Sequence, residues 1–137
     1  MANASWALQQ AVFARLTSDS ALIALLGGAR VYDDVPVRAA FPYVAFAPGS
    51  ARDWSAGDEA GTEHAVVLHV WSRASGRKET LAVIEALRAA LHDAALSLTD
   101  HRLINLRHET SDVRRETDGE TYQGIVRFRA VTEANSA

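Results

Sequence analysis

Cysteine is absent from the 137 residues of this chain. Its absence excludes disulfide bonds, thiolate nucleophiles and every zinc site that depends on cysteine. A chain of this length buries roughly two thirds of its unfolded surface without such cross-links. We therefore expect residues 1–137 to form a single domain with one hydrophobic core.

Long apolar runs are also missing, since no stretch approaches the roughly 18 residues of a membrane span. The first six residues lack the basic and then apolar pattern of a signal peptide. The net charge of −3 and the pI of 5.9 give no general attraction to nucleic acid or to anionic lipid. We expect a soluble, unprocessed chain with no membrane partner, for which any contact with DNA is passive.

Motifs for catalysis, metals and nucleotides are missing as well. His64 and His69 lie five residues apart on an expected strand and so point to opposite faces, and His101 and His108 are also separated by an odd number. No Gly-x-Ser-x-Gly elbow or HExxH helix occurs, and the only adjacent glycines lack the spacing of a phosphate loop. The sequence predicts no catalytic residue, no metal site and no cofactor.

The pattern of apolar residues predicts an α+β fold. We expect a largely antiparallel sheet with two main helices packed on one of its faces. Asp19 or Ser18 is expected to cap the second helix, and Gly27 with Gly28 to end it. The expected helices span residues 5–17, 22–26 and 77–95, and the clearest strands span residues 43–47, 63–71, 103–114 and 122–132.

The segment 31–46 is conformationally constrained but carries no reactive group. Pro36 and Pro42 fix their own φ angles and hold the preceding residues extended, so the chain must run strand, loop, strand. The polar stretch 48–62 follows and is predicted to be a long hairpin loop. Loops of this length are usually either disordered or functional. Its single tryptophan, Trp54, is expected either to anchor a partner or to fold back over the core.

Two further expectations concern packing in the second half of the chain. The helix over residues 77–95 should bury Leu81, Ile84, Leu87 and Leu91 and leave an alanine-rich outer side. A tight turn at Asp118 and Gly119 would place Glu109 opposite Phe128 on an apolar face, which predicts a bulge or a wider loop.

The arginines of the last two strands form the main basic concentration, although acidic residues are interspersed among them. One interpretation is that the acidic residues neutralise the arginines in salt bridges at an edge of the sheet. The other is that the arginines contact a protein partner. With the polar stretch, these strands supply the candidate interface residues, which are Arg52, Asp53, Trp54, Asp58, Glu59, Arg114, Arg115, Arg127 and Arg129.

The order and spacing of these motifs resemble the tail terminator or tail completion proteins of phages, whose relatives occur in gene transfer agents. The resemblance covers nearly the whole chain and depends on the motifs in conjunction. They are Arg30-Val31-Tyr32, Val35-Pro36, Phe41-Pro42-Tyr43-Val44, Val70-Trp71-Ser72-Arg73, Gly76-Arg77-Lys78-Glu79, Asp118-Gly119, Tyr122, Gly124, Val126 and Phe128.

The resemblance implies a structural virion protein that is made in the bacterial cytoplasm and resides in the tail–neck region. It would form a homohexameric ring on the head-proximal end of the tail tube, stop tube polymerisation and join the tail to a head–neck connector or stopper protein. DNA would pass through the ring, with Asp53, Asp58 and Glu59 keeping phosphates from adhering.

Two alternatives remain open from the sequence. Another connector or stopper protein of the neck could share this order of elements. A small α+β enzyme or ligand-binding module would instead use a pocket near Tyr43, His69 and Trp71.

Overall fold

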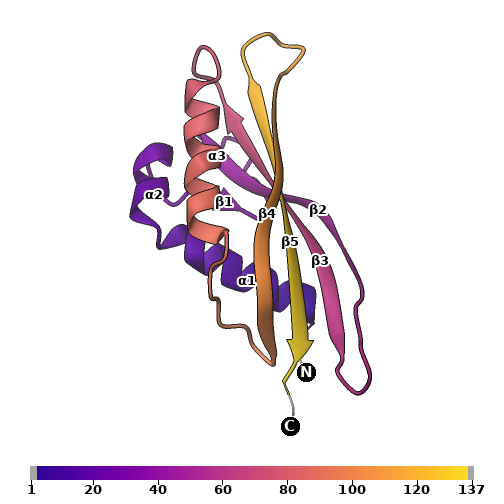
Figure 1. Ribbon diagram of the computed structural model, residues 1–137. Helices are drawn as coiled ribbons and strands as arrows, with labels where there is room; N and C mark the ends of the chain where they lie inside the picture. The colour runs from indigo at the N-terminus through magenta and orange to yellow at the C-terminus, as the bar shows by residue number, and fades with distance from the viewer. Residues whose placement is uncertain (1–2, 136–137) are drawn as a thin grey trace.

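The structure is a computed structural model that describes residues 3–135. Its three helices are α1 (Ala4–Thr17), α2 (Ser20–Leu26) and α3 (Lys78–Leu91), and all lie on one side of the sheet (Figure 1). The Asp19 carboxylate accepts the Leu22 N–H at 2.9 Å, and Gly27 ends α2 with a φ of +80°. Both boundary predictions for α2 are therefore confirmed. None of the three helices is long and apolar enough to cross a membrane.

Five strands form one sheet in the order β1-β2-β3-β5-β4. Every neighbouring pair is antiparallel except β1 and β2, which are parallel. The predicted α+β fold with a largely antiparallel sheet is confirmed. The strands are β1 (Val31–Tyr32), β2 (Tyr43–Asp53), β3 (Gly61–Ser72), β4 (His101–Arg115) and β5 (Tyr122–Ala134).

The core lies between the helices and the even-numbered positions of β3 and β5. Because successive side chains of a strand point to opposite faces, Leu68, Val126 and Phe128 all meet the helices. The helices contribute Leu8, Val12, Leu16, Val83, Ile84 and Leu87 to the same buried cluster.

Helix α3 is shorter than the sequence predicts, and one of the four residues predicted to be buried is exposed. Leu81 is 51% exposed, whereas Ile84, Leu87 and Leu91 are buried as predicted, and Val83 and Ala90 are buried with them. The helix ends at Leu91 because the next residues bond to β4. The Asp93 N–H donates to the Leu106 carbonyl at 2.8 Å, and the His92 ring accepts the His108 N–H at 3.0 Å.

The polar stretch 48–62 is not a long loop, because β2 continues to Asp53 and β3 begins at Gly61. The strand crosses a register shift between Ala47 and Ser50, where a Cβ on Gly49 would lie 2.2 Å from the Ala65 carbonyl oxygen. Glycine at this position therefore lets the two backbones approach closely. Only residues 54–60 form the connection between the two strands. This connection and the adjoining ends of β2 and β3 extend to one end of the molecule, and we call them the β2–β3 arm (Figure 1).

The predicted irregularity opposite Phe128 is confirmed. His108 is the residue that pairs with Phe128, Thr110 pairs with Arg127, and Glu109 is the extra residue of a bulge. The turn at residues 116–121 is also wider than a two-residue hairpin. A second shift between Leu103 and Asn105 brings His101 onto the same face as His108, so the opposite orientation predicted for a continuous strand is not found.

Candidate functional site

The sheet face that points away from the helices is the candidate site, and we call it the outer face. It is built from the odd-numbered positions of β3 and β5 and from their partners on β2 and β4. In Figure 1 the helices occupy only the opposite side of the sheet. The outer face carries Tyr43, Arg52, Glu63, Val67, His69, Trp71, Asp112, Arg114, Ile125, Arg127 and Arg129.

Trp54 lies on the outer face between two arginines. The Arg52 and Arg129 guanidinium carbons lie 5.8 and 5.1 Å from the centre of the indole ring, within the range of a cation–π contact. The Glu63 carboxylate accepts hydrogen bonds from both guanidinium groups. We call these four residues the Trp54 cluster.

The Trp54 cluster is held by electrostatics and still presents an aromatic surface. The hydrogen bond from Arg52 is the main cause that lowers the pKa of Glu63, and Arg129 adds to it. Glu63 therefore stays ionised between the two cations at neutral pH. Trp54 itself is 48% exposed, so of the two alternatives for this residue the one in which it folds back over the core was wrong.

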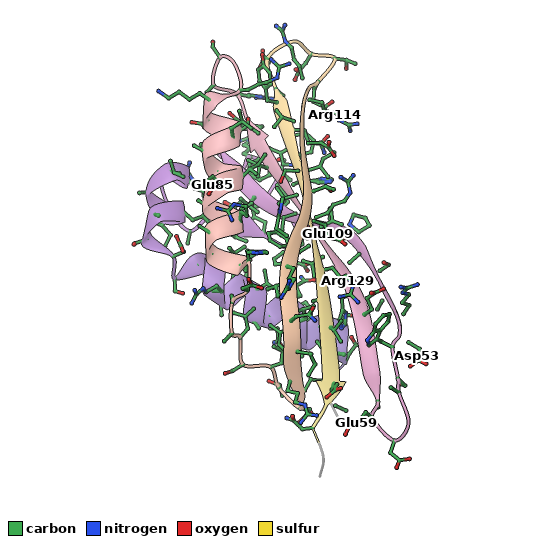
Figure 2. All side chains as sticks on the ribbon, viewed as in Figure 1. Asp53, Glu59, Glu85, Glu109, Arg114 and Arg129 are labelled. Atoms are coloured by element: carbon green, nitrogen blue, oxygen red, sulfur yellow. The ribbon has the colours of Figure 1, made fainter. Side chains whose placement is uncertain are left out.

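A row of paired arginines continues along the outer face beyond this cluster. Arg127 donates to the Asp112 carboxylate at 2.8 Å, and Arg114 donates to the Gln123 side chain at 2.8 Å. Figure 2 shows Arg114 and Arg129 at different heights along the sheet, and Glu85 on α3 at the other side. These pairs fit the predicted salt-bridged surface.

The remaining candidate residues lie in or directly beside the two hairpin connections. Asp53 accepts a hydrogen bond from the Ser55 hydroxyl at 2.6 Å, and Glu59 lies 3.5 Å from Arg102. Asp58 belongs to the same connection between β2 and β3, whereas Arg115 donates to the Gly119 carbonyl at the far end of β4. The nine predicted residues therefore do not converge on one point, and only Arg52, Trp54 and Arg129 share a cluster.

An open hollow of about 420 Å³ adjoins the outer face where the alternative ligand pocket was expected. Tyr43 and Trp71 line it, but His69 does not, because its ring lies against Trp71 and near the Gln123 amide. Arg73 lies 4.3 Å above the Phe41 ring, and burial raises the pKa of Tyr43. Two of the three expected residues are thus brought together, without the histidine that motivated the hypothesis.

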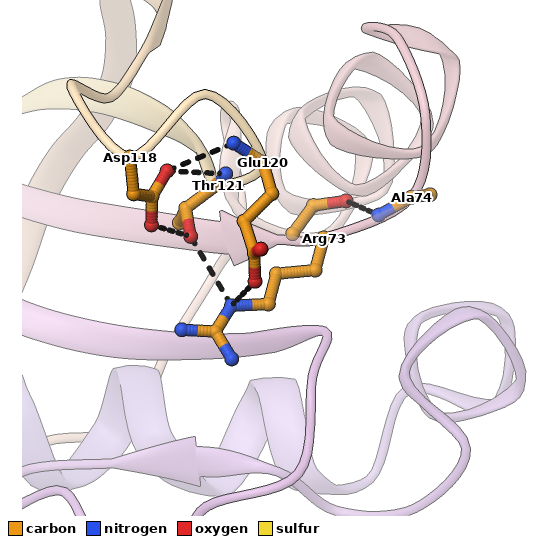
Figure 3. Close-up of polar contacts among 6 residues, drawn as sticks. Arg73, Ala74, Asp118, Glu120 and Thr121 are labelled. Atoms are coloured by element: carbon orange, nitrogen blue, oxygen red, sulfur yellow. Dashed lines mark hydrogen bonds and ion pairs between the residues drawn. The ribbon is translucent and has the colours of Figure 1, made fainter.

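The turn between β4 and β5 forms the rim of this hollow. Asp118 accepts the N–H groups of Glu120 and Thr121 at 2.9 and 2.8 Å, and the Thr121 hydroxyl at 2.7 Å (Figure 3). Arg73 donates to the Thr121 hydroxyl at 3.1 Å and lies 3.4 Å from Glu120. The bond from the Thr121 hydroxyl is the main cause that lowers the pKa of Asp118 to about 2.

We expect Asp118→Asn to lower the Tm at neutral pH and to make stability less sensitive to acid. The folded pKa of about 2 lies below the ordinary 3.8, so the ionised carboxylate stabilises the fold above pH 4. That contribution is lost as the pH falls from about 4 to 2. Thermal unfolding measured between pH 4 and pH 2 should show that the difference in Tm between wild type and variant becomes smaller as the pH falls. A gap that stays constant, or one matched by the control Asp58→Asn, would contradict the assignment.

The histidines of β3 point to opposite faces, as the spacing predicts. His64 faces the helices, where its ring lies 2.9 Å from the Thr132 hydroxyl and 3.4 Å from the Ser5 hydroxyl. Burial lowers the pKa of both His64 and His69. Within residues 3–135, no group of three or more histidine, aspartate or glutamate side chains is placed to hold a metal ion.

Sequence reasoning missed two residues of the site, Glu63 and Arg73. Glu63 lies in the predicted strand, but its partner Arg52 lies in the stretch that was expected to be a loop, so their pairing was missed. Arg73 directly follows β3 and links three segments of the hollow.

Taken together, the geometry defines an α+β protein that presents an exposed, arginine-rich sheet face. The model of the family described as Tail completion protein gp17 matches residues 10–133, and the chain belongs to this family. Among solved structures, it is similar to a chain in the virion of a native gene transfer agent particle, with a TM-score of 0.89 and 32% identity. That likeness covers 98% of this chain and 100% of the other. No curated protein matches the chain.

The family and the structural likeness identify the protein as a structural component of a virion tail. The predicted resemblance to tail completion proteins and to their gene transfer agent relatives is therefore confirmed, as is the predicted location in a virion.

Proposed function

We propose that the protein, as a single tail-terminator-like domain, forms a homohexameric ring that caps the head-proximal end of the tail tube. The ring ends tube polymerisation and joins the tail to a head–neck connector or stopper protein, and the protein catalyses no reaction. The observation that carries the proposal is the match to tail completion proteins over residues 10–133. The likeness to a virion chain over 98% of the length supports it.

A ring of identical subunits requires two different patches on each copy that fit one another. The Trp54 cluster is one such patch, because a half-exposed tryptophan held by two arginines is the composition typical of interface hot spots. It adjoins the β2–β3 connection, which projects beyond the body of the sheet in Figure 1. We propose that this arm docks on a neighbouring subunit or on the last ring of the tube.

The charges of the arm suit a channel through which DNA passes. Asp53, Asp58 and Glu59 gather at its end, and Figure 2 shows Asp53 and Glu59 at the same end of the molecule. Carboxylates that face the lumen repel phosphates and so keep DNA mobile. We therefore propose that the arm both contacts a neighbouring protein and lines the channel through which DNA passes.

The proposal is tested by mixing the purified protein with tail-tube protein and counting subunits by native mass spectrometry. We expect six copies in the ring, and negative-stain images should show tubes of finite length with an extra ring at one end. Monomers at every concentration that never bind tubes or neck proteins would contradict it. A ring that binds the portal side and not the tube would instead identify a connector or stopper.

A further inference from the structure

The two edges of the sheet differ in how far other segments cover them. On the β2 side, β1 pairs only with Val44 and Ala45. On the β4 side, the connection after α3 bonds to Leu106 and His108, and an isolated bridge joins Ser97 to Arg102. Each edge is therefore covered over one half and bare over the other.

The direction of the bare backbone groups follows from hydrogen bonds of known direction along each strand. The N–H of Val44 donates to the Arg30 carbonyl and so points out of the sheet, while that of Trp54 donates to Gly61 on β3 and points inward. Alternation along an antiparallel strand, with one shift at the β2 bulge, makes Ala51 and Asp53 point outward beyond the part of β2 that β1 covers.

The same reasoning applies to β4. The His108 N–H points outward to His92, and the bulge at Glu109 shifts the alternation by one residue. Ser111 and Val113 therefore point their backbone N–H and C=O groups out of the sheet. Within residues 3–135, no other segment bonds to the outward backbone groups of these two residues, or to those of Ala51 and Asp53, which lie beyond the part of β2 that pairs with β1.

The two bare halves lie diagonally across the sheet. The bare half of β2 leads to the β2–β3 connection, and the bare half of β4 leads to the β4–β5 turn at the opposite end (Figure 1). Unpaired edge groups are a template for an added strand. Through their pairings with β3 and β5, β2 and β4 run in opposite directions.

We infer that the bare edge of β2 in one copy pairs antiparallel with the bare edge of β4 in the next copy, which joins the sheets around the ring. This inference rests on the proposed function and specifies the contact by which the ring closes. Copies that share one orientation along the ring axis bring opposite strand directions together, as antiparallel pairing requires. The diagonal offset staggers neighbours along the strands, as the closure of a sheet into a barrel demands.

The side chains beside the two edges are compatible with this contact. Arg52 on β2 and Asp112 on β4 both lie on the outer face, their side chains are 71% and 64% exposed, and their charges are opposite. On the helix side, Ala51 and Ser111 are small and exposed, so neither obstructs an approaching strand. Both faces of the junction are therefore complementary in charge or size.

The contact is tested by cross-linking the double variant Ala51→Cys, Ser111→Cys, which introduces the only thiols of the chain. Rings assembled with tail-tube protein are treated with a short bis-maleimide and run on a denaturing gel. We expect a ladder of covalent multimers that ends at the subunit number of the ring. The matched control Ala89→Cys, Ser111→Cys places one thiol on the exposed side of α3 and should give no ladder.

A second comparison removes one outward N–H group. Ser111→Pro should raise the concentration at which rings dissociate by about tenfold, roughly the effect of one lost backbone hydrogen bond. Ser111→Ala keeps that N–H group, loses the same hydroxyl and should dissociate like the wild type.

The possible outcomes distinguish a failure of the edge pairing from a failure of the proposed function. Rings that form without a ladder, or a ladder that the Ala89→Cys control reproduces, would overturn the edge pairing and leave the proposed function standing. Equal dissociation of the Ser111→Pro and Ser111→Ala rings would also overturn it. If no ring forms and no tube is bound, the proposed function fails and the edge pairing fails with it.

Discussion

Phe128→Ala is expected to lower the free energy of unfolding by about 3–5 kcal/mol, the usual cost of truncating a buried phenylalanine. Phe128 is fully buried on β5, where it faces the helices and packs edge-on against His108 with ring centres 5.6 Å apart. Its removal takes away apolar contact and leaves a cavity that a close-packed core fills only in part. Thermal unfolding followed by circular dichroism should show a Tm lower by on the order of 10 °C.

The control for this prediction is Ile104→Ala on the same hairpin. Ile104 is an apolar residue of β4, but it is 48% exposed at a bulge, so its truncation should change stability by less than about 0.5 kcal/mol. Equal losses for the two variants would mean that Phe128 is not at the centre of the core.

Trp54→Ala is expected to weaken ring assembly by about thirtyfold, which corresponds to a hot spot of about 2 kcal/mol. The substitution removes the aromatic surface and leaves the Arg52 and Arg129 guanidinium groups bound only to Glu63. Because Trp54 lies outside the core, the folded monomer should keep nearly the Tm of the wild type. Sedimentation or native mass spectrometry across a dilution series measures the effect.

A second exposed tryptophan provides the matched control. Trp6 on α1 is 50% exposed, close to the exposure of Trp54, but it lies on the helix side of the molecule. Trp6→Ala should therefore leave assembly unchanged. If both variants assemble like the wild type, the Trp54 cluster is not part of the ring contact.

Local signals predicted several elements well because their causes lie within a few residues. Asp19 caps α2 and Gly27 ends it, since both act on backbone groups of the adjacent turn. The bulge at Glu109 was also predictable, because strict alternation would have placed a carboxylate opposite Phe128 in the core.

Other features were missed because they depend on partners that are distant in the sequence. The end of α3 at Leu91 is determined by bonds from His92 and Asp93 to β4. The second bulge, near Ile104, places His101 and His108 on the same face of the sheet, and the charge pattern of the sequence does not predict this bulge. Polar composition likewise concealed that residues 50–53 continue β2, since β3 supplies their hydrogen-bonding partner.

By itself, the sequence determined the absence of thiol chemistry, the α+β order of elements, the caps of α2, the bulge opposite Phe128 and the resemblance to tail completion proteins. These follow from composition and from interactions between near neighbours. The tertiary structure alone decided that Trp54 lies on the outer face, that Glu63 joins Arg52 to Arg129, and which halves of the sheet edges stay bare. The physical reason is that strand register brings together residues as far apart as Glu63 and Arg129, and register is set by the whole sheet.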